Sequence, residues 1–290
     1  MTAGTLPEQL TPSIAAKRNS RRPPVPIIVA IVIMTLIVLL AIFGPLIAPE
    51  DPAHIDLLTG LSGPTSGHPL GTDDLGRDIL SRVIAGTPTA LLGAAGVALG
   101  SILLGSILGL LSGYRGGWVD TVIMRWVDLN FALPSLLVVI IVGGVLGGSY
   151  LSAILMLCVL SSPTDARLIR GATLEQRSLP YVEAATTLGF RPLRIMIREV
   201  WPNLRPIILA NGFLEFAGGL LALSALSFLG IGVGPGTADW GRMLNESRDM
   251  LAQNPFTALA PGLMIVLTAT SMNLIGDWLS EVAEERGRTR

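Results

Sequence analysis

Cysteine and histidine are scarce in this chain of 290 residues. Cys158 is the single cysteine and lies in an apolar stretch, so an internal disulfide is excluded and a buried thiol is expected. The two histidines, His54 and His68, share one polar stretch and are too few and too far apart to form a metal cage. The sequence therefore gives no support for a disulfide framework or a metal centre.

Charge is also scarce, because charged residues make up 14% of the chain, where soluble domains have about 25%. With 50% hydrophobic residues, lipid is the expected solvent. The net charge of −1 provides no basic field for nucleic acid. No phosphate-binding loop, zinc helix or nucleophile elbow occurs, so we expect no cofactor, no bound ATP and no catalytic reaction in this chain.

Long apolar runs are what the chain has in place of charge. A membrane-spanning helix needs about 20 apolar residues. Runs with at most one internal charge cover 27–47, 88–114, 129–164, 205–231 and 250–276. The first run is longer than the apolar core of a cleavable signal, about 7–15 residues, so it predicts an uncleaved helix.

The run 129–164 is too long for one helix. Gly143, Gly144, Gly147 and Gly148 interrupt it and predict a hairpin. Its first helix should start near Val119, and its second should run from about residue 150 into 165–170. The chain is therefore expected to be an all-α membrane protein with six transmembrane helices.

The basic residues orient these helices. With the N-terminus inside, the outer segments hold only Arg77, Arg82, Arg242 and Arg248, and the inner segments hold the remaining sixteen of 20 lysines and arginines. Positive residues concentrate on the cytoplasmic side of membrane proteins. Both termini are therefore expected in the cytoplasm.

The predicted organisation has three parts. Residues 1–26 form a flexible cytoplasmic tail, 27–280 the six-helix domain, and 281–290 a second cytoplasmic tail. Within the domain, 48–86 and 232–249 should face outward, and 165–204 should face the cytoplasm. Such polar segments must be in water or covered by protein, so soluble partners can contact the chain there.

The cytoplasmic segment carries the pattern of two short helices. Ser178 can cap the first, with Pro180 in its first turn, and Gly189 suits the position just past its end. Pro192 can open a second helix, which Trp201 and Pro202 are expected to end.

The second short helix is predicted to be amphipathic. Arg191, Arg194 and Arg198 fall on one stripe. The apolar positions Leu193, Met196, Ile197 and Val200 fall elsewhere. On pattern alone, a helix pair lying on the anionic inner leaflet explains this segment as well as a protein-docking site does.

The order of residues in 183–202 (EAATTLGFRPLRIMIREVWP) resembles the cytoplasmic coupling loop of ABC-importer permeases. The matching positions are Glu183, Ala184, Ala185 and Gly189. The resemblance implies that this loop, with its basic residues, docks on an ATP-hydrolysing subunit. A short rigid helix suits such coupling because it can transmit rigid-body motion.

Further segments resemble the dipeptide, oligopeptide and nickel branch of that family, in its C-type permease. They are 68–82 (HPLGTDDLGRDILSR), 166–171 (ARLIRG), 226–233 (LSFLGIGV), 239–246 (DWGRMLNE), 261–268 (PGLMIVLT) and 273–277 (NLIGD). Asp165, Glu199, Trp201 and Leu223 depart from the usual residues. The resemblance implies the type I importer architecture, in which this chain is one half of a pore.

The implied partners are a second, homologous permease subunit, two ATP-binding domains, an extracytoplasmic substrate-binding protein and membrane lipid. The implied solute is a dipeptide or oligopeptide, with nickel, glutathione or haem as alternatives. A secondary transporter is a competing class, but it calls for intramembrane charges on repeated halves, and only Glu215 offers one.

Two features inside the spans have competing interpretations. Glu215 is an ionisable group near mid-membrane, which either lines a translocation path or pairs structurally. Gly96, Gly100, Gly105, Gly109 and Gly113 form small-residue stripes, for which close helix packing is favoured over contact with solute.

Overall fold

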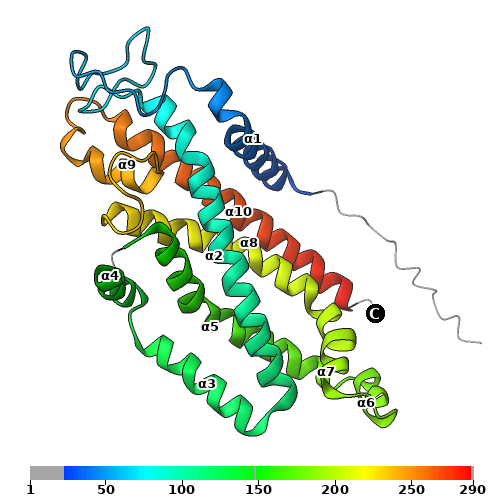
Figure 1. Cartoon of the computed structure of the whole chain (residues 1–290). Coiled ribbons are helices and arrows are strands. Elements are labelled where there is room, and N and C mark those ends of the chain that lie inside the picture. Colours follow the sequence, from blue (N-terminus) through cyan, green and yellow to red (C-terminus); the bar gives the residue numbers. More distant parts are fainter. Residues whose placement is uncertain (1–22, 147, 289–290) are drawn as a thin grey trace, which may run out of the picture.

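Helices account for most of the computed structural model, which describes residues 23–146 and 148–288 (Figure 1). The long helices are α1 (Val25–Ile47), α2 (Ile79–Arg115), α3 (Gly117–Ala132), α4 (Ser135–Leu146), α5 (Tyr150–Arg177), α8 (Trp201–Phe228) and α10 (Phe256–Arg288). The shorter helices are α6 (Pro180–Thr187), α7 (Pro192–Ile195), a π-helical turn (Met196–Val200), α9 (Trp240–Glu246) and a 3-10 turn (Ser247–Asp249). The all-α prediction is confirmed.

Five helices in the described residues are long and apolar enough to cross a membrane, and α3 with α4 gives a sixth span if the bent pair counts as one. The axis bends by 92° between α3 and α4. The helix expected from near Val119 is instead divided into α3 and α4, because Pro134 follows Leu133 and a residue before proline avoids the α region. Leu133 accordingly has φ −104° and ψ 135°.

Helix α2 starts earlier than the apolar run indicated. Asp78 caps it, accepting a hydrogen bond from the backbone N–H of Ser81. The first turn was missed because it contains Arg82, whose charge is paired in the folded chain. The predicted break between the hairpin helices is confirmed, since α4 ends at Leu146 and α5 begins at Tyr150.

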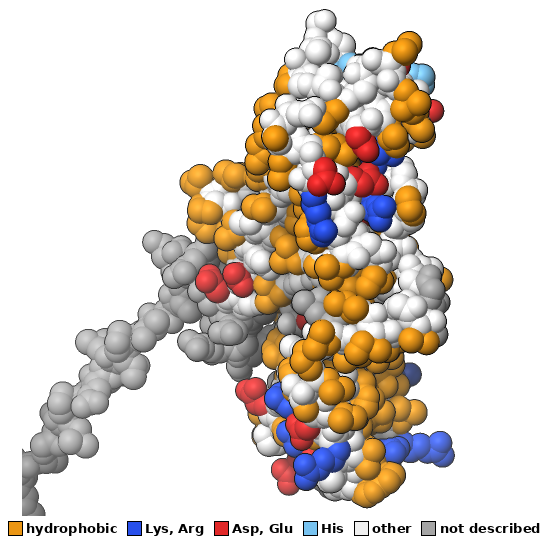
Figure 2. All heavy atoms as spheres, turned by 90° about the vertical axis from the view of Figure 1, so that its left-hand side faces the viewer, with side chains coloured by type: hydrophobic (Ala, Val, Ile, Leu, Met, Phe, Trp, Pro, Cys, Tyr) orange, Lys and Arg blue, Asp and Glu red, His pale blue; other side chains and the backbone are white. Residues whose placement is uncertain are grey.

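Helix α2 runs through the middle of the molecule and packs against α1, α5, α8 and α10 (Figure 1). Its small residues Ala90, Ala94 and Ala98 share a core with Phe216 of α8 and Ile265 of α10. On the face drawn in Figure 2, charged side chains gather mainly in an upper and a lower zone. Exposed apolar side chains cover much of the surface between these zones, as expected for contact with lipid.

The glycines of α2 bring it against α5. A Cβ added at Gly109 would lie 2.6 Å from the carbonyl oxygen of Ala166, and one at Gly113 would lie 2.7 Å from Cβ of Thr173. Gly96 and Gly100 face Ile154 and Cys158 in the same way. Every one of these neighbours belongs to α5, so the packing interpretation of the stripe is confirmed.

Replacing Gly109 with valine should separate α2 from α5, because the nearest atoms are backbone and cannot move aside. We expect loss of folded protein or a clearly lower thermal midpoint in detergent, with a cost of about 1–3 kcal/mol from overpacking. Gly171→Ala is the matched control, since no atom lies within 4 Å of an added Cβ there. Equal thermal midpoints for the two variants would contradict the close-packing role.

Candidate coupling site and buried polar clusters

Helix α6 forms a projecting tip at the lower end of the molecule (Figure 1). Pro180 occupies its first turn as predicted, but the residue before the helix is Leu179, and Ser178 does not cap it. The Ser178 hydroxyl instead donates to the carbonyl of Glu175. Gly189 lies just past the helix with φ +77°, a backbone conformation that glycine adopts without steric cost, so its predicted position at the helix end is confirmed.

The tip is anchored by apolar side chains on its inner face. Val182 and Ala185 of α6 are buried together with Ile195, Met196 and Val200. This cluster also holds Leu110 and Tyr114 from the end of α2 and Ile169 of α5. The helix pair is therefore fixed to the ends of two spans, α2 and α5.

The outer face of the tip is open. Glu183, Ala184 and Gly189 are exposed, whereas Ala185 is buried. An added Cβ at Gly189 would meet no atom within 4 Å. Of the four positions that carry the family resemblance, three are thus available to a partner and one supports the helix from within.

The predicted basic stripe is exposed, but the predicted apolar face was partly wrong. Arg191, Arg194 and Arg198 all lie at the surface, where the Arg194 guanidinium stacks 4.0 Å from the ring centre of Phe190. Of the four apolar positions, Met196 and Val200 are buried, whereas Leu193 and Ile197 are exposed.

The second short helix is longer than predicted. The second short helix does not end at Trp201 and Pro202; it continues through the π-helical turn into α8. A π-turn accommodates one extra residue and rotates the following face. Pro202 lies where the π-helical turn gives way to α8.

An open cavity of about 330 Å³ lies beside α6. It is lined by Tyr114, Arg177, Ser178, Val182, Glu183 and Thr186. Its walls come from the ends of α2 and α5 as well as from α6. A partner side chain bound there would contact two spans and the tip together.

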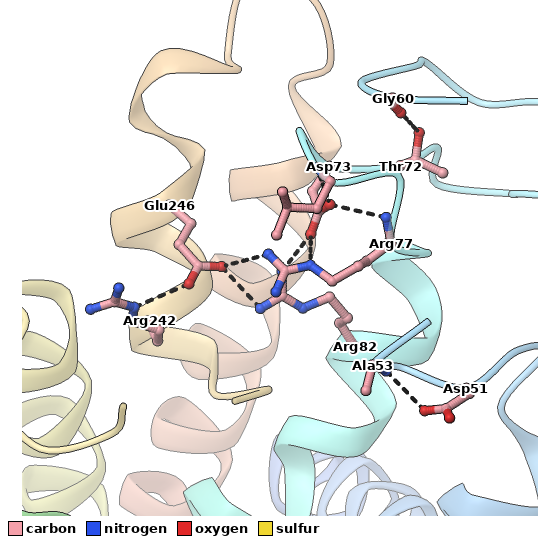
Figure 3. A network of polar contacts seen from close by, with 10 residues as sticks. Asp51, Ala53, Gly60, Thr72, Asp73, Arg77, Arg82, Arg242 and Glu246 are labelled. Atoms are coloured by element: carbon pink, nitrogen blue, oxygen red, sulfur yellow. Dashed lines mark hydrogen bonds and ion pairs between the residues drawn. The ribbon is translucent and has the colours of Figure 1, made fainter. Parts of the chain in front are cut away.

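At the opposite end, an outer network of ion pairs joins the start of α2 to α9 (Figure 3). It consists of Asp73, Arg77, Arg82, Arg242 and Glu246. Arg77 Nε lies 2.7 Å from Asp73 Oδ2, and Arg82 Nη2 lies 2.9 Å from Glu246 Oε2. The Arg82 side chain is fully buried, although it belongs to the segment that sequence reasoning placed outside the membrane.

The outer network sets the charge state of Glu246. Burial alone would raise the pKa of this carboxyl, but the guanidinium groups of Arg82, Arg242 and Arg77 outweigh burial and hold the pKa below its usual value. Glu246 is therefore ionised at neutral pH, and the network is a set of true ion pairs. The segments 68–82 and 239–246, which sequence reasoning treated separately, meet in this network.

Glu215 lies half-buried in α8, and its neighbours come from two other helices. The hydroxyl of Ser101 on α2 lies 3.5 Å from Glu215 Oε2. The same hydroxyl donates to Asp165 of α5 at 2.7 Å, and the Asn211 amide donates to the other oxygen of Asp165 at 2.6 Å. Sequence reasoning assigned Asp165 to the cytoplasmic segment and missed this cluster.

Comparison with known proteins decides the family. A model described as the binding-protein-dependent transport system inner membrane component matches residues 101–288. A second model, the N-terminal TM domain of oligopeptide transport permease C, matches residues 27–64. The chain belongs to this permease family. Its predicted location as a multi-pass protein of the bacterial inner membrane is confirmed with it.

The permease is similar to curated proteins along most of its length. It is 34% identical to the dipeptide transport system permease protein DppC of Alkalihalophilus pseudofirmus over 89% of this chain and 85% of that protein. It is 36% identical to the di/tripeptide permease DppC of Pseudomonas aeruginosa, covering 87% of this chain and 86% of that protein. It is also 36% identical to the glutathione permease GsiD of Escherichia coli O6:K15:H31, covering 97% and 93%.

The permease fold is also found in a solved structure. A chain of the MetNI methionine ABC transporter in an inward-facing conformation matches with a TM-score of 0.57 and 16% identity. The match covers 71% of this permease and 97% of that chain. The predicted importer-permease architecture is confirmed by this likeness.

Proposed function

We propose that this permease forms half of the translocation pore of an ATP-driven importer for dipeptides and related short peptides. The other half is a homologous permease subunit. Two ATP-binding domains bind at the cytoplasmic side, a substrate-binding protein delivers solute from outside, and this chain itself performs no catalysis. The names of the DppC relatives, at 34% and 36% identity over most of the chain, carry the choice of solute.

The contact with the ATP-binding domains is assigned to the open tip. Glu183, Ala184 and Gly189 present its exposed face, and the exposed arginines at 191, 194 and 198 extend it. The buried anchor formed by Val182, Ala185 and Ile195 supports this assignment, because it joins the tip to α2 and α5. Movement of the tip is thereby transmitted to the spans.

The same assignment places both termini in the cytoplasm, with the outer network on the extracytoplasmic side. The sixteen-to-four distribution of basic residues supports this orientation. The half-buried Glu215 borders the translocation path in this arrangement. The tails at 1–26 and 281–290 remain assigned to the cytoplasm, although residues 1–22 and 289–290 lie outside the described part of the chain.

Glutathione import is the second candidate. The GsiD relative is as similar as the peptide permeases and matches over 97% of this chain. Glutathione is itself a short peptide, so one pore can suit both solutes. Selection between them then rests with the binding protein.

ATP hydrolysis by the reconstituted complex tests the proposal. The substrate-binding protein is loaded in turn with dipeptides, longer peptides, glutathione, a nickel chelate or haem. Dipeptide-loaded protein is expected to stimulate hydrolysis most. Stimulation by glutathione alone would establish the second candidate, and solute transport by this chain in liposomes without ATP would overturn the importer assignment.

A further inference from the structure

Two carboxylates meet where α2, α5 and α8 pack together, and no arginine or lysine among the described residues pairs with either. Ser101 and Asp165 have no exposed surface, and Glu215 is partly buried. A single serine hydroxyl lies between the two carboxylates, 2.7 Å from Asp165 and 3.5 Å from Glu215. The negative charge of these carboxylates must therefore be reduced by a proton or by hydrogen bonds within the cluster.

Nearby charges on the surrounding helices are engaged elsewhere. On α5, Arg167 pairs with Asp128 at 3.0 Å and Arg170 with Asp120 at 2.6 Å. Helix α2 carries charge only near its ends, at Arg82 and Arg115. On α10, Asp277 follows Gly276, which packs against Ala210, Phe213 and Leu214 of α8, so Asp277 lies near the level of Glu215, but its side chain is exposed. The charged residues of the other elements packed against α8 include Asp239, Arg242 and Glu246 at α9, Glu281 of α10, and Arg198 and Glu199 of the π-helical turn.

Hydrogen counting distinguishes the two carboxyl groups. Asp165 accepts from Asn211 on one oxygen and from Ser101 on the other, which suits an ionised carboxylate. Once the single Ser101 hydroxyl hydrogen is donated to Asp165, the serine oxygen can only accept a hydrogen bond from Glu215. An ionised Glu215 would then face that oxygen with no hydrogen between them, whereas a protonated Glu215 can donate to it.

We propose that Glu215 and Asp165 are positioning residues that hold one proton between them through Ser101. Glu215 carries the proton and donates to Ser101, Ser101 donates to Asp165, and Asn211 donates to the second oxygen of Asp165. Two ionised carboxylates at this depth would repel each other and be poorly solvated, so one proton is retained. The chain of hydrogen bonds fastens α8 to α2 and α5.

The proton makes this link sensitive to pH. When Glu215 loses its proton to alkaline solvent, the one serine hydrogen cannot serve both carboxylates, and the contact between α8 and α2 weakens. A glutamine at this position keeps a donor toward Ser101 at every pH. The Glu215→Gln variant should therefore keep the link and lose its pH dependence.

Infrared spectroscopy of the full complex in lipid membranes tests the proton directly. At neutral pH we expect a protonated-carboxyl band that disappears at alkaline pH, is absent in Glu215→Gln and persists in Glu50→Gln, a control at an exposed outer acid. Absence of the band from the unmodified permease, or its persistence in Glu215→Gln, would overturn the proposal.

Uptake provides a second readout, which rests on the proposed importer function. ATP-driven uptake by the unmodified complex should fall from neutral to alkaline pH, Glu215→Gln should remove this fall, and Ser101→Ala should lower uptake at all pH values. Identical pH profiles for the unmodified protein and Glu215→Gln would overturn the positioning role. If no uptake occurs with any solute, the importer function fails, while the infrared result still decides the shared proton.

Discussion

Uptake is expected to fall at least about tenfold in Glu183→Ala while the permease still inserts in the membrane. The Glu183 carboxylate is exposed, and among the described residues it takes part in no ion pair or side-chain hydrogen bond, so its removal leaves the tip folded. A hydrogen bond to a charged group contributes about 1.5–3 kcal/mol, which corresponds to about ten- to a hundredfold in association. Co-purification of the ATP-binding subunit and uptake in vesicles measure the loss.

Glu175→Ala is the matched control, because Glu175 is an exposed glutamate at the end of α5 and lies outside the tip. It should leave both measurements unchanged. Gly189→Asp adds a second change at the tip, where φ is positive and space is open. A stably inserted Glu183→Ala/Gly189→Asp double variant with full uptake would disprove the assigned coupling site.

The second large effect is expected in the outer network, in Arg82→Met. Methionine fills part of the buried volume but removes one of the two guanidinium groups that bridge Asp73 and Glu246, so that only Arg77 still links them (Figure 3). The carboxylate oxygens of Asp73 and Glu246 each lose a charged hydrogen bond from Arg82, and a hydrogen bond to a charged group contributes about 1.5–3 kcal/mol. We expect a markedly lower thermal midpoint in detergent and faster proteolysis of the segments around 68–82 and 239–246.

Arg242→Ala is the control within the same network. Arg242 is less buried and makes one ion pair, to Glu246 Oε1 at 3.1 Å, so its loss should cost much less. Equal losses for Arg82→Met and Arg242→Ala would show that burial of Arg82 contributes nothing to stability.

The membrane spans were predictable because their signal is local. An uncharged run of sufficient length requires a helix in lipid, and glycines mark the turn before Tyr150. The bend at Leu133 escaped notice because apolar composition continues unchanged across it. The first turn of α2 was not predicted because Arg82 interrupts the apolar run. In the folded chain the charge of Arg82 is paired with Asp73 and with the distant Glu246.

The candidate sites also differ in whether their residues are adjacent or distant in the sequence. The tip could be found because its helix start, glycine end and basic stripe are adjacent in the chain. The outer network and the Asp165 cluster could not, because Glu246 is 164 positions from Arg82 and Asp165 is 64 positions from Ser101. No pattern along the chain indicates which distant acid a buried arginine or serine will meet.

The π-helical turn at Met196–Val200 has a consequence for how the permease tolerates change in length. The chain from Pro192 to Phe228 forms one 37-residue rod, with the basic stripe at one end and the membrane core at the other. The extra residue of the π-helical turn sets the angle, around the helix axis, between the basic stripe and the membrane-spanning part. Deleting one residue there would turn the arginines about 100° around the rod axis relative to the span. The number of residues between the tip and the membrane core must therefore be kept if the arginines are to face the same way.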